Sequence, residues 1–159
     1  MARNLGKGAR VTQRMKKMTK KAAPMNYESA RDYLLGKPEA ELDYPFGPDV
    51  AVPKICGKMF ATLGEETENG KTVGHMNLKC DPVEAEFLRD MFESVLPGYH
   101  MNKVHWNTIV LDGTIPNGEI ERMIDSSYAL VVKRLKKAER VKLEVRYGKA
   151  ALYPSEQEN

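Results

Sequence analysis

One short segment of the sequence concentrates side chains that could do chemistry. Residues 97–108, with the sequence PGYHMNKVHWNT, contain two of the three histidines, His100 and His105, and the only tryptophan, Trp106. Two asparagines and a lysine lie among them. Imidazole, amide and ammonium groups this close together suit an active site, a ligand-binding surface or a crowded strand end.

A metal site is the first chemistry to consider, because histidine is a common metal ligand. His100 and His105 are five positions apart, so in a strand they point to opposite faces, and on a helix they are separated by roughly 140°. Only an intervening turn would bring them together, and nothing in the sequence places His75 beside them. We therefore predict no metal site and no cofactor.

Cys80 is the candidate for nucleophilic catalysis. It directly precedes a helix that Asp81 opens, and a helix N-terminus lowers the pKa of a thiol. The alternative is a small buried residue at a strand-helix junction, which is the usual place of a free cysteine. The chain contains no GxSxG, Walker or GxGxxG motif. We predict a protein that is not an enzyme and has no catalytic residues.

A polar surface that binds a ligand is the remaining interpretation of this segment. In a strand over residues 105–110, alternate side chains face opposite sides. One side presents His105, Asn107 and Ile109, and the other presents Trp106, Thr108 and Val110. We expect Trp106 in the core, with Lys103, His105 and Asn107 as hydrogen-bond donors beside a turn. Such donors suit phosphates or base edges, and a small anionic ligand equally well.

The net charge of +3 hides an uneven distribution. Residues 1–25 hold eight basic and no acidic side chains (+8), whereas the remainder holds 17 basic and 22 acidic side chains (−5). Within this arm, a weakly amphipathic helix would place four basic side chains beside an apolar stripe: Arg10, Arg14, Lys17 and Lys21. The arm suits contact with phosphate or an acidic protein. A solvated tail and a mitochondrial targeting segment are the alternatives.

Composition limits the class of protein further. A chain of 159 residues with 42% hydrophobic and 30% charged residues is typical of one globular domain with short extensions. The two cysteines, Cys56 and Cys80, form no CxxC pair, which favours a reducing cytoplasm. No apolar run is long enough to span a membrane, and the N-terminus has no secretory signal.

The elements that must position these residues can be predicted from periodicity and from turn signals. A helix begins near Asn26 and ends at Gly36, and the clearest helix follows Asp81 and Pro82. The predicted strands cover residues 49–55, 58–63, 72–79, 98–101 and 105–111, with turns at Gly57 and at Asn69-Gly70. Pro53 favours an edge strand or a bulge. The last helix runs from about residue 116 to about residue 138.

This order predicts a two-layer α+β fold, with an antiparallel sheet and helices on one side, in the order α-β-β-β-α-β-β-α. We divide the chain into a basic arm (1–25), the α+β domain (26–140) and a C-terminal extension (141–159).

Three segments resemble a known family. They are DYPFGPDVAVPKICGKMFA (43–61), NLKCDP (77–82) and PGYHMNKVHWNTIVLDG (97–113), and they are similar to the signature blocks of the MmcQ/YjbR-like proteins over about residues 26–135. The matching positions are Lys58, Asn77, Lys79, Asp81, Tyr99, His100, Asn102, Lys103, His105, Trp106 and Asn107. The resemblance implies a CyaY-like or secretion-chaperone-like fold group and DNA binding through a double-wing arrangement of the hairpins. Pro53 and the basic extensions depart from the pattern.

We therefore predict a non-enzymatic, cytoplasmic protein that binds DNA or another nucleic acid, without membrane association. The predicted nucleic-acid-binding residues are Arg10, Arg14, Lys17, Lys21, Lys54, Lys58, Lys79, Lys103, His105 and Asn107. The alternative is a small-molecule or protein-partner module that uses the polar cluster of residues 99–107. An enzyme that uses Cys80 or a histidine is a third possibility.

Overall fold

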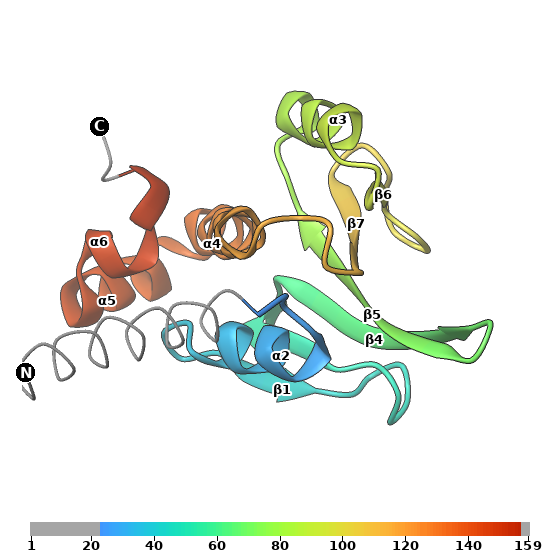
Figure 1. The fold of residues 1–159 in the computed structure, drawn as a ribbon. Helices are drawn as coiled ribbons and strands as arrows, with labels where there is room; N and C mark the ends of the chain where they lie inside the picture. Colours follow the sequence, from blue (N-terminus) through green and yellow to red (C-terminus); the bar gives the residue numbers. More distant parts are fainter. Residues whose placement is uncertain (1–22, 157–159) are drawn as a thin grey trace, which may run out of the picture.

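The computed structural model describes residues 23–156 (Figure 1). The elements are α2 (Tyr27–Leu35), β1 (Glu41–Asp43), β2 (Val52–Ile55), β3 (Lys58–Met59), β4 (Ala61–Glu68), β5 (Lys71–Lys79), α3 (Pro82–Met91), β6 (Val95–Pro97), β7 (Trp106–Leu111), α4 (Asn117–Lys133), α5 (Lys137–Tyr147), α6 (Lys149–Leu152) and the 3-10 helix η1 (Pro154–Glu156). The predicted α+β class is confirmed. The arm residues Arg10, Arg14, Lys17 and Lys21 lie outside the described residues.

The strands form two antiparallel sheets, where the sequence predicted one. The smaller sheet has the order β1-β2-β3, and the larger has the order β4-β5-β7-β6. An isolated bridge between Ala51 and Leu63 joins them. The strand predicted over residues 98–101 is wrong, because β6 lies at Val95–Pro97 and the later residues form a loop.

Pro53 explains where the sheets divide. The expectation of an edge position is wrong, because β2 is the central strand of the smaller sheet. Continuing the β2–β3 register places Pro53 opposite Phe60, and the Phe60 N–H donates to the Pro53 carbonyl at 3.0 Å. Proline has no N–H to return the bond. The Phe60 carbonyl accepts instead from the Ser127 hydroxyl on α4, at 2.6 Å, and β3 ends one residue earlier.

Both predicted tight turns are confirmed. Cys56-Gly57 joins β2 to β3 with φ values of 49° and 75°, and Asn69-Gly70 joins β4 to β5 with 52° and 79°. Two consecutive residues with positive φ are the signature of a type I′ turn, whose twist matches that of the flanking strands. Glycine at the second position adopts this conformation without strain.

The larger sheet buries one face under helices. On β5, Gly74, Met76 and Leu78 are buried, whereas His75 and Asn77, which alternate with them, are half-buried. A Cβ atom on Gly74 would lie 3.5 Å from the backbone of Tyr27, so the start of α2 packs against this face. Helices α3 and α4 cover the same face, and the core includes Ile109 and Leu111 of β7. Helices on one side of the sheet were predicted correctly.

Helix α3 begins as the sequence predicted and packs differently. The Asp81 carboxylate accepts from two N–H groups of the first turn, and Pro82 occupies the first position. Only Ala85 and Leu88 of this helix are buried. Phe87 and Met91 lie at helical spacing beside Leu88, yet they are 60% and 53% exposed. The apolar side of α3 is therefore wider than the part of it that packs on the sheet.

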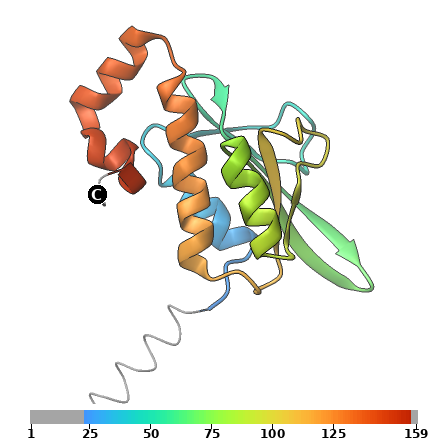
Figure 2. The same ribbon diagram turned by 90° about the horizontal axis from the view of Figure 1, so that it is seen from above.

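The last predicted helix is two helices. Helix α4 ends at Lys133, and α5 begins at Lys137 in a new direction (Figure 2). Leu143 of α5 and Leu152 of α6 join the hydrophobic core, so the segment after residue 140 packs on the domain. No helix within residues 23–156, the 17-residue α4 included, is long and apolar enough to cross a membrane.

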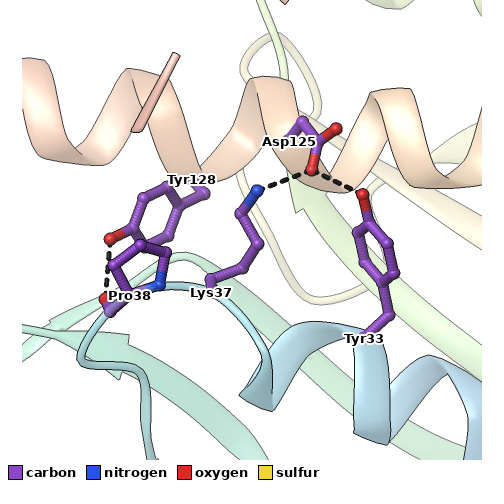
Figure 3. Close-up of polar contacts among 5 residues, drawn as sticks. All are labelled: Tyr33, Lys37, Pro38, Asp125 and Tyr128. Carbon is purple, nitrogen blue, oxygen red and sulfur yellow. Dashed lines mark hydrogen bonds and ion pairs between the residues drawn. The ribbon is translucent and has the colours of Figure 1, made fainter. Parts of the chain in front are cut away.

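A polar cluster fastens α2 and the turn after it to α4 (Figure 3). The Lys37 ammonium lies 2.7 Å from the Asp125 carboxylate, and their side chains are only 10% and 15% exposed. The Tyr33 hydroxyl donates to the same carboxylate oxygen at 2.9 Å. The Tyr128 hydroxyl donates to the Pro38 carbonyl at 2.7 Å. Burial, followed by the hydrogen bond to Asp125, raises the pKa of Tyr33 well above its usual value.

Candidate functional site

The 97–108 segment closes a loop between β6 and β7. The Gly98 N–H donates to the Trp106 carbonyl at 2.9 Å, and a Cβ atom on Gly98 would lie only 2.9 Å from Trp106 atoms. Only glycine permits so close an approach. The Asn102 carboxamide then accepts from the N–H of Val104 and of His105, which shapes the turn. The crowding of polar residues here therefore builds a defined loop.

The two faces of β7 were assigned the wrong way round. The predicted alternation is present, but the core face is the one that contains Asn107 and Ile109, which are both almost fully buried. Trp106 is half-buried on the other face. The Asn107 carboxamide accepts from Arg89 at 2.8 Å and donates to the Ala85 carbonyl at 3.2 Å. Asn107 therefore fastens α3 to β7, and its amide is not presented to solvent.

A first candidate site lies where β5 ends and β7 begins. Lys79, the last residue of β5, is opposite Trp106, and the next N–H, of Cys80, donates to the His105 carbonyl at 2.8 Å. Burial, followed by the nearby positive charge of Arg134, lowers the pKa of Lys79. Arg134 is the C-cap of α4, so the end of this helix lies beside the end of β5. Two distant segments thus bring their positive charges together.

More cations surround this pair. The Lys103 carbonyl accepts from Arg89 at 3.4 Å, which holds the loop near α3. β3 leads directly into β4, whose first residue pairs with Leu78, so the exposed Lys58 belongs to the same end of the sheet. We call this surface the basic end, and it consists of Lys58, Lys79, Lys103, His105, Arg134, Lys136 and Lys137. In Figure 2 the junction of α4 and α5 lies far from the β4–β5 turn, at the opposite end of the molecule.

The charges of the basic end are available to a ligand. Arg134, Lys136 and Lys137 are exposed, and none has a carboxylate within 4.0 Å among residues 23–156. Residues 133–149 hold eight basic and two acidic side chains, a net +6. By contrast, the predicted contact Lys54 is occupied, because its ammonium lies 2.7 Å from the Asp43 carboxylate.

A second candidate site lies on the sheet face that carries no helix within the described residues. We call it the open-face pocket. It is a cavity of about 510 Å³ between the loop before β2, strands β4 and β5, and the loop after β6. Its lining residues are Phe46, Asp49, Val50, Thr62, Gly64, Glu65, Glu66, His75, Asn77, Tyr99, His100 and Met101. Three are carboxylates and none is Lys or Arg, so the pocket is unsuited to the small anionic ligand that the sequence allowed.

His75 and His100 both line the open-face pocket, and His105 lies elsewhere. His75 lies 3.9 Å from the Glu66 carboxylate, whereas His105 lies at the basic end. Within residues 23–156, no group of three or more His, Cys, Asp or Glu side chains is placed to hold a metal ion. His100 adopts a positive φ of 58°, and its ring centroid lies 4.0 Å from that of Tyr99.

Cys80 has the environment of a structural thiol. It is only 7% exposed, and burial, followed by the charges of Glu84 and Asp81, raises its pKa to about 12. The N-terminus of α3 therefore does not activate it, because desolvation and the acidic cap outweigh the helix dipole. A reactive thiolate at neutral pH is unsupported at this position.

The elements and their order define a small α+β domain of two antiparallel sheets. The chain belongs to the YjbR family, whose model matches residues 35–130. It is 34% identical to the uncharacterized protein YjbR of Escherichia coli K12 over 116 residues, which are 73% of this chain and 95% of that protein. It is 37% identical to YbdF of Escherichia coli O157:H7 over 111 residues, 70% of this chain and 88% of that protein.

Solved structures agree with this assignment. The crystal structure of Deinococcus radiodurans protein DR2400 has a TM-score of 0.67 and 34% sequence identity, and the match covers 77% of this chain and 91% of that one. A crystal structure of a Pseudomonas syringae protein has a TM-score of 0.60 and 32% identity, and the match covers 67% and 98% of the two chains. None of these names states a function.

The family match separates two kinds of charge. Residues 35–130 hold eight basic and sixteen acidic side chains, a net −8. The eight basic residues of 133–149 lie just beyond this range. The contacts predicted from the sequence did not include Arg134, Lys136 or Lys137. The sequence signal for them is the density of basic residues from Lys133 to Lys149.

Proposed function

We propose that the protein binds nucleic acid, DNA foremost, through phosphate contacts at the basic end, and that it does so in the cytoplasm without catalysing a reaction. The observation that carries the proposal is the cluster of exposed cations from three separate segments on one end of an otherwise acidic domain. Phosphate contacts need cations that are free of carboxylate partners, and Arg134, Lys136 and Lys137 meet this requirement within the described residues.

The position of these cations alters the expected mode of contact. The resemblance implied that hairpins act as two wings. The tip of the β4–β5 hairpin (residues 65–71), however, carries Glu65, Glu66 and Glu68 against the single cation Lys71, so this tip repels a polyanion. The proposal therefore assigns the contact to Lys58 of the other hairpin, to the loop before β7 and to the α4–α5 junction.

The basic arm would add to the same affinity. Residues 1–25 carry +8, and electrostatic attraction for a polyanion grows with each cation that releases a counterion from it. The arm and the basic end are separable in experiment, because Gln can replace their cations in the full chain without a change of length. Replacing Arg10, Arg14, Lys17 and Lys21 tests the arm alone.

The test is a titration of the full chain with duplex DNA over a range of salt concentrations. Log K should fall linearly with log salt concentration, with a slope of about −0.9 for each phosphate contacted. Replacing Arg134 and Lys137 by Gln should make that slope shallower by about 1.8. The control replaces Lys71 and Arg122 by Gln, which removes the same charge from exposed positions elsewhere.

The control variant should bind as the parent protein does. A salt-independent affinity, or equal losses in the two double variants, would contradict the proposal. If only the arm variant loses affinity, the arm carries the binding and the basic end does not.

A further inference from the structure

We propose that the open-face pocket binds a small organic cation, an amine with an apolar or aromatic body. The pocket lies on the face of the sheet opposite the helices, and its volume of about 510 Å³ is within the range of small-molecule sites. This inference does not depend on nucleic-acid binding, because no residue of the basic end lines the pocket.

The charge of the lining favours a cation. Asp49, Glu65 and Glu66 supply carboxylates, and no Lys or Arg is present to neutralise them from within the lining. Within residues 23–156, the only basic side chain within 4.0 Å of the Glu66 carboxylate is His75, at 3.9 Å. An amine would gain a partner here, and an anion would be repelled.

The rim supplies aromatic surface for the body of the ligand. Phe46 and Tyr99 are 67% and 61% exposed, although large aromatic side chains usually bury more of their area. They reach the pocket from two loops that are far apart in sequence. Aromatic faces attract cations as well as apolar groups, so the rim and the carboxylates favour the same ligand.

The floor is a fixed network of polar side chains. Asn77 donates to the Thr62 hydroxyl at 3.0 Å and accepts from the Thr108 hydroxyl. Thr108 in turn accepts from the Tyr99 N–H at 2.9 Å, which ties the rim to the floor. Thr62 is only 6% exposed. Its hydroxyl accepts from Asn77, and among the described residues its hydrogen is donated to no acceptor. It remains available to an acceptor on the ligand.

Gly64 keeps the centre of the pocket open. It lies on β4 opposite His75, and its absent side chain would project on the pocket side, because a Cβ there would meet Asp49 and Val50. Those contacts, at 3.6 and 3.9 Å, are ordinary van der Waals distances. A larger residue at this position would therefore fill the pocket while the strand stays unstrained.

Three probes of one size and different charge test the proposal. They are 2-phenylethylamine, which is a cation at neutral pH, 2-phenylethanol, which is neutral, and phenylacetate, which is an anion. Binding to the isotope-labelled full chain is followed by the amide resonances of residues 62–66, 75–77 and 99–101. The amine should shift these resonances with a roughly millimolar dissociation constant. The alcohol should bind about tenfold more weakly, and phenylacetate should bind least.

Variants locate the binding. Gly64→Leu should abolish the shifts caused by the amine, and Glu66→Gln should weaken amine binding about threefold. The matched control is Glu86→Gln, which removes the same charge from an exposed position on α3 and should change nothing. Unchanged amide spectra outside the pocket verify that the variants fold.

Several results would overturn the proposal. They are the absence of shifts at these amides with millimolar amine, equal binding of amine and phenylacetate, and amine binding that survives Gly64→Leu. Duplex DNA that shifts the same amides would assign the pocket to a polyanion instead. Loss of DNA binding at the basic end would leave the amine result unaffected, so the two proposals fail independently.

Discussion

The basic end and the open-face pocket lie on one small domain and have opposite chemistry. At the basic end, cations gather from the end of β5, the loop before β7 and the α4–α5 junction. The pocket has three carboxylates, two aromatic residues on its rim and a polar floor. The 97–108 segment contributes to both, through Lys103 and His105 on one side and Tyr99 and His100 on the other. Net charge alone therefore says little about what such a domain binds.

The largest effect should come from breaking the scaffold that both surfaces share. Asp125→Ala leaves the buried Lys37 ammonium without its carboxylate and the Tyr33 hydroxyl without its acceptor. The free energy of unfolding should fall by about 3 kcal/mol, measured by urea denaturation. Both binding activities should persist wherever the variant is folded, because neither surface is changed.

The control for that variant is Asp43→Ala. It breaks the exposed pair with Lys54, whose side chains are 26% and 54% exposed, and should cost much less stability because solvent already screens the pair. If the two variants lose equal stability, the polar cluster of Tyr33, Lys37 and Asp125 does not fasten α2 to α4.

Charge reversal at the basic end should weaken DNA binding without changing amine binding at the open-face pocket. Arg134→Glu with Lys137→Glu should weaken DNA binding about a hundredfold near physiological salt, because attraction is replaced by repulsion at two contacts. Fluorescence anisotropy of labelled duplex measures this change. Binding of 2-phenylethylamine should be the same as in the parent protein. A parallel loss of amine binding would mean that the two surfaces are coupled.

Thr108→Val should act on the pocket alone. It removes the acceptor of the Tyr99 N–H and the donor to Asn77, and leaving these partly buried groups unpaired costs about 1 kcal/mol. Hydrogen exchange at the Tyr99 amide should become faster. Thr67→Val, at the exposed Thr67–Thr72 pair of the β4–β5 hairpin, is the matched control and should have little effect. Unchanged exchange at Tyr99 would show that the floor does not hold the rim.

The smallest effect is expected at Lys54. Because its ammonium is already paired with Asp43, Lys54→Gln should change DNA affinity by less than about twofold, whereas Lys58→Gln should reduce the salt slope by about 0.9. Titrations of the two variants side by side make the comparison. A larger loss of DNA affinity for Lys54→Gln would mean that Lys54 contacts DNA after all.

Local signals in the sequence predicted much of this fold. Asn26, Asp81 and Pro82 marked the helix starts, and Asn69-Gly70 marked a turn, because these residues act through their own backbone geometry. Alternation on β7 was also predicted, but the choice of its core face was not. That choice depends on Arg89 and Ala85 of α3, which satisfy the buried Asn107 amide from another element.

The candidate sites were harder to predict for the same reason. The basic end joins Lys79 to Arg134, which are far apart in the sequence, and only tertiary packing places their charges together. The open-face pocket needs Phe46 and Tyr99 from separate loops across one sheet face. The residue pattern within a single helix or strand does not show which distant segments come into contact. The division of the sheet was predictable in part. Pro53 indicated that one backbone donor is missing, but not that the Ser127 hydroxyl would donate to the Phe60 carbonyl instead.

The most direct test of the two-surface account is one labelled sample of the full chain, titrated first with duplex DNA and then with 2-phenylethylamine. The account predicts two separate sets of shifted amides: residues 79–80, 103–106 and 133–137 with DNA, and residues 62–66, 75–77 and 99–101 with the amine. A single common set of amides shifted by both ligands would contradict it.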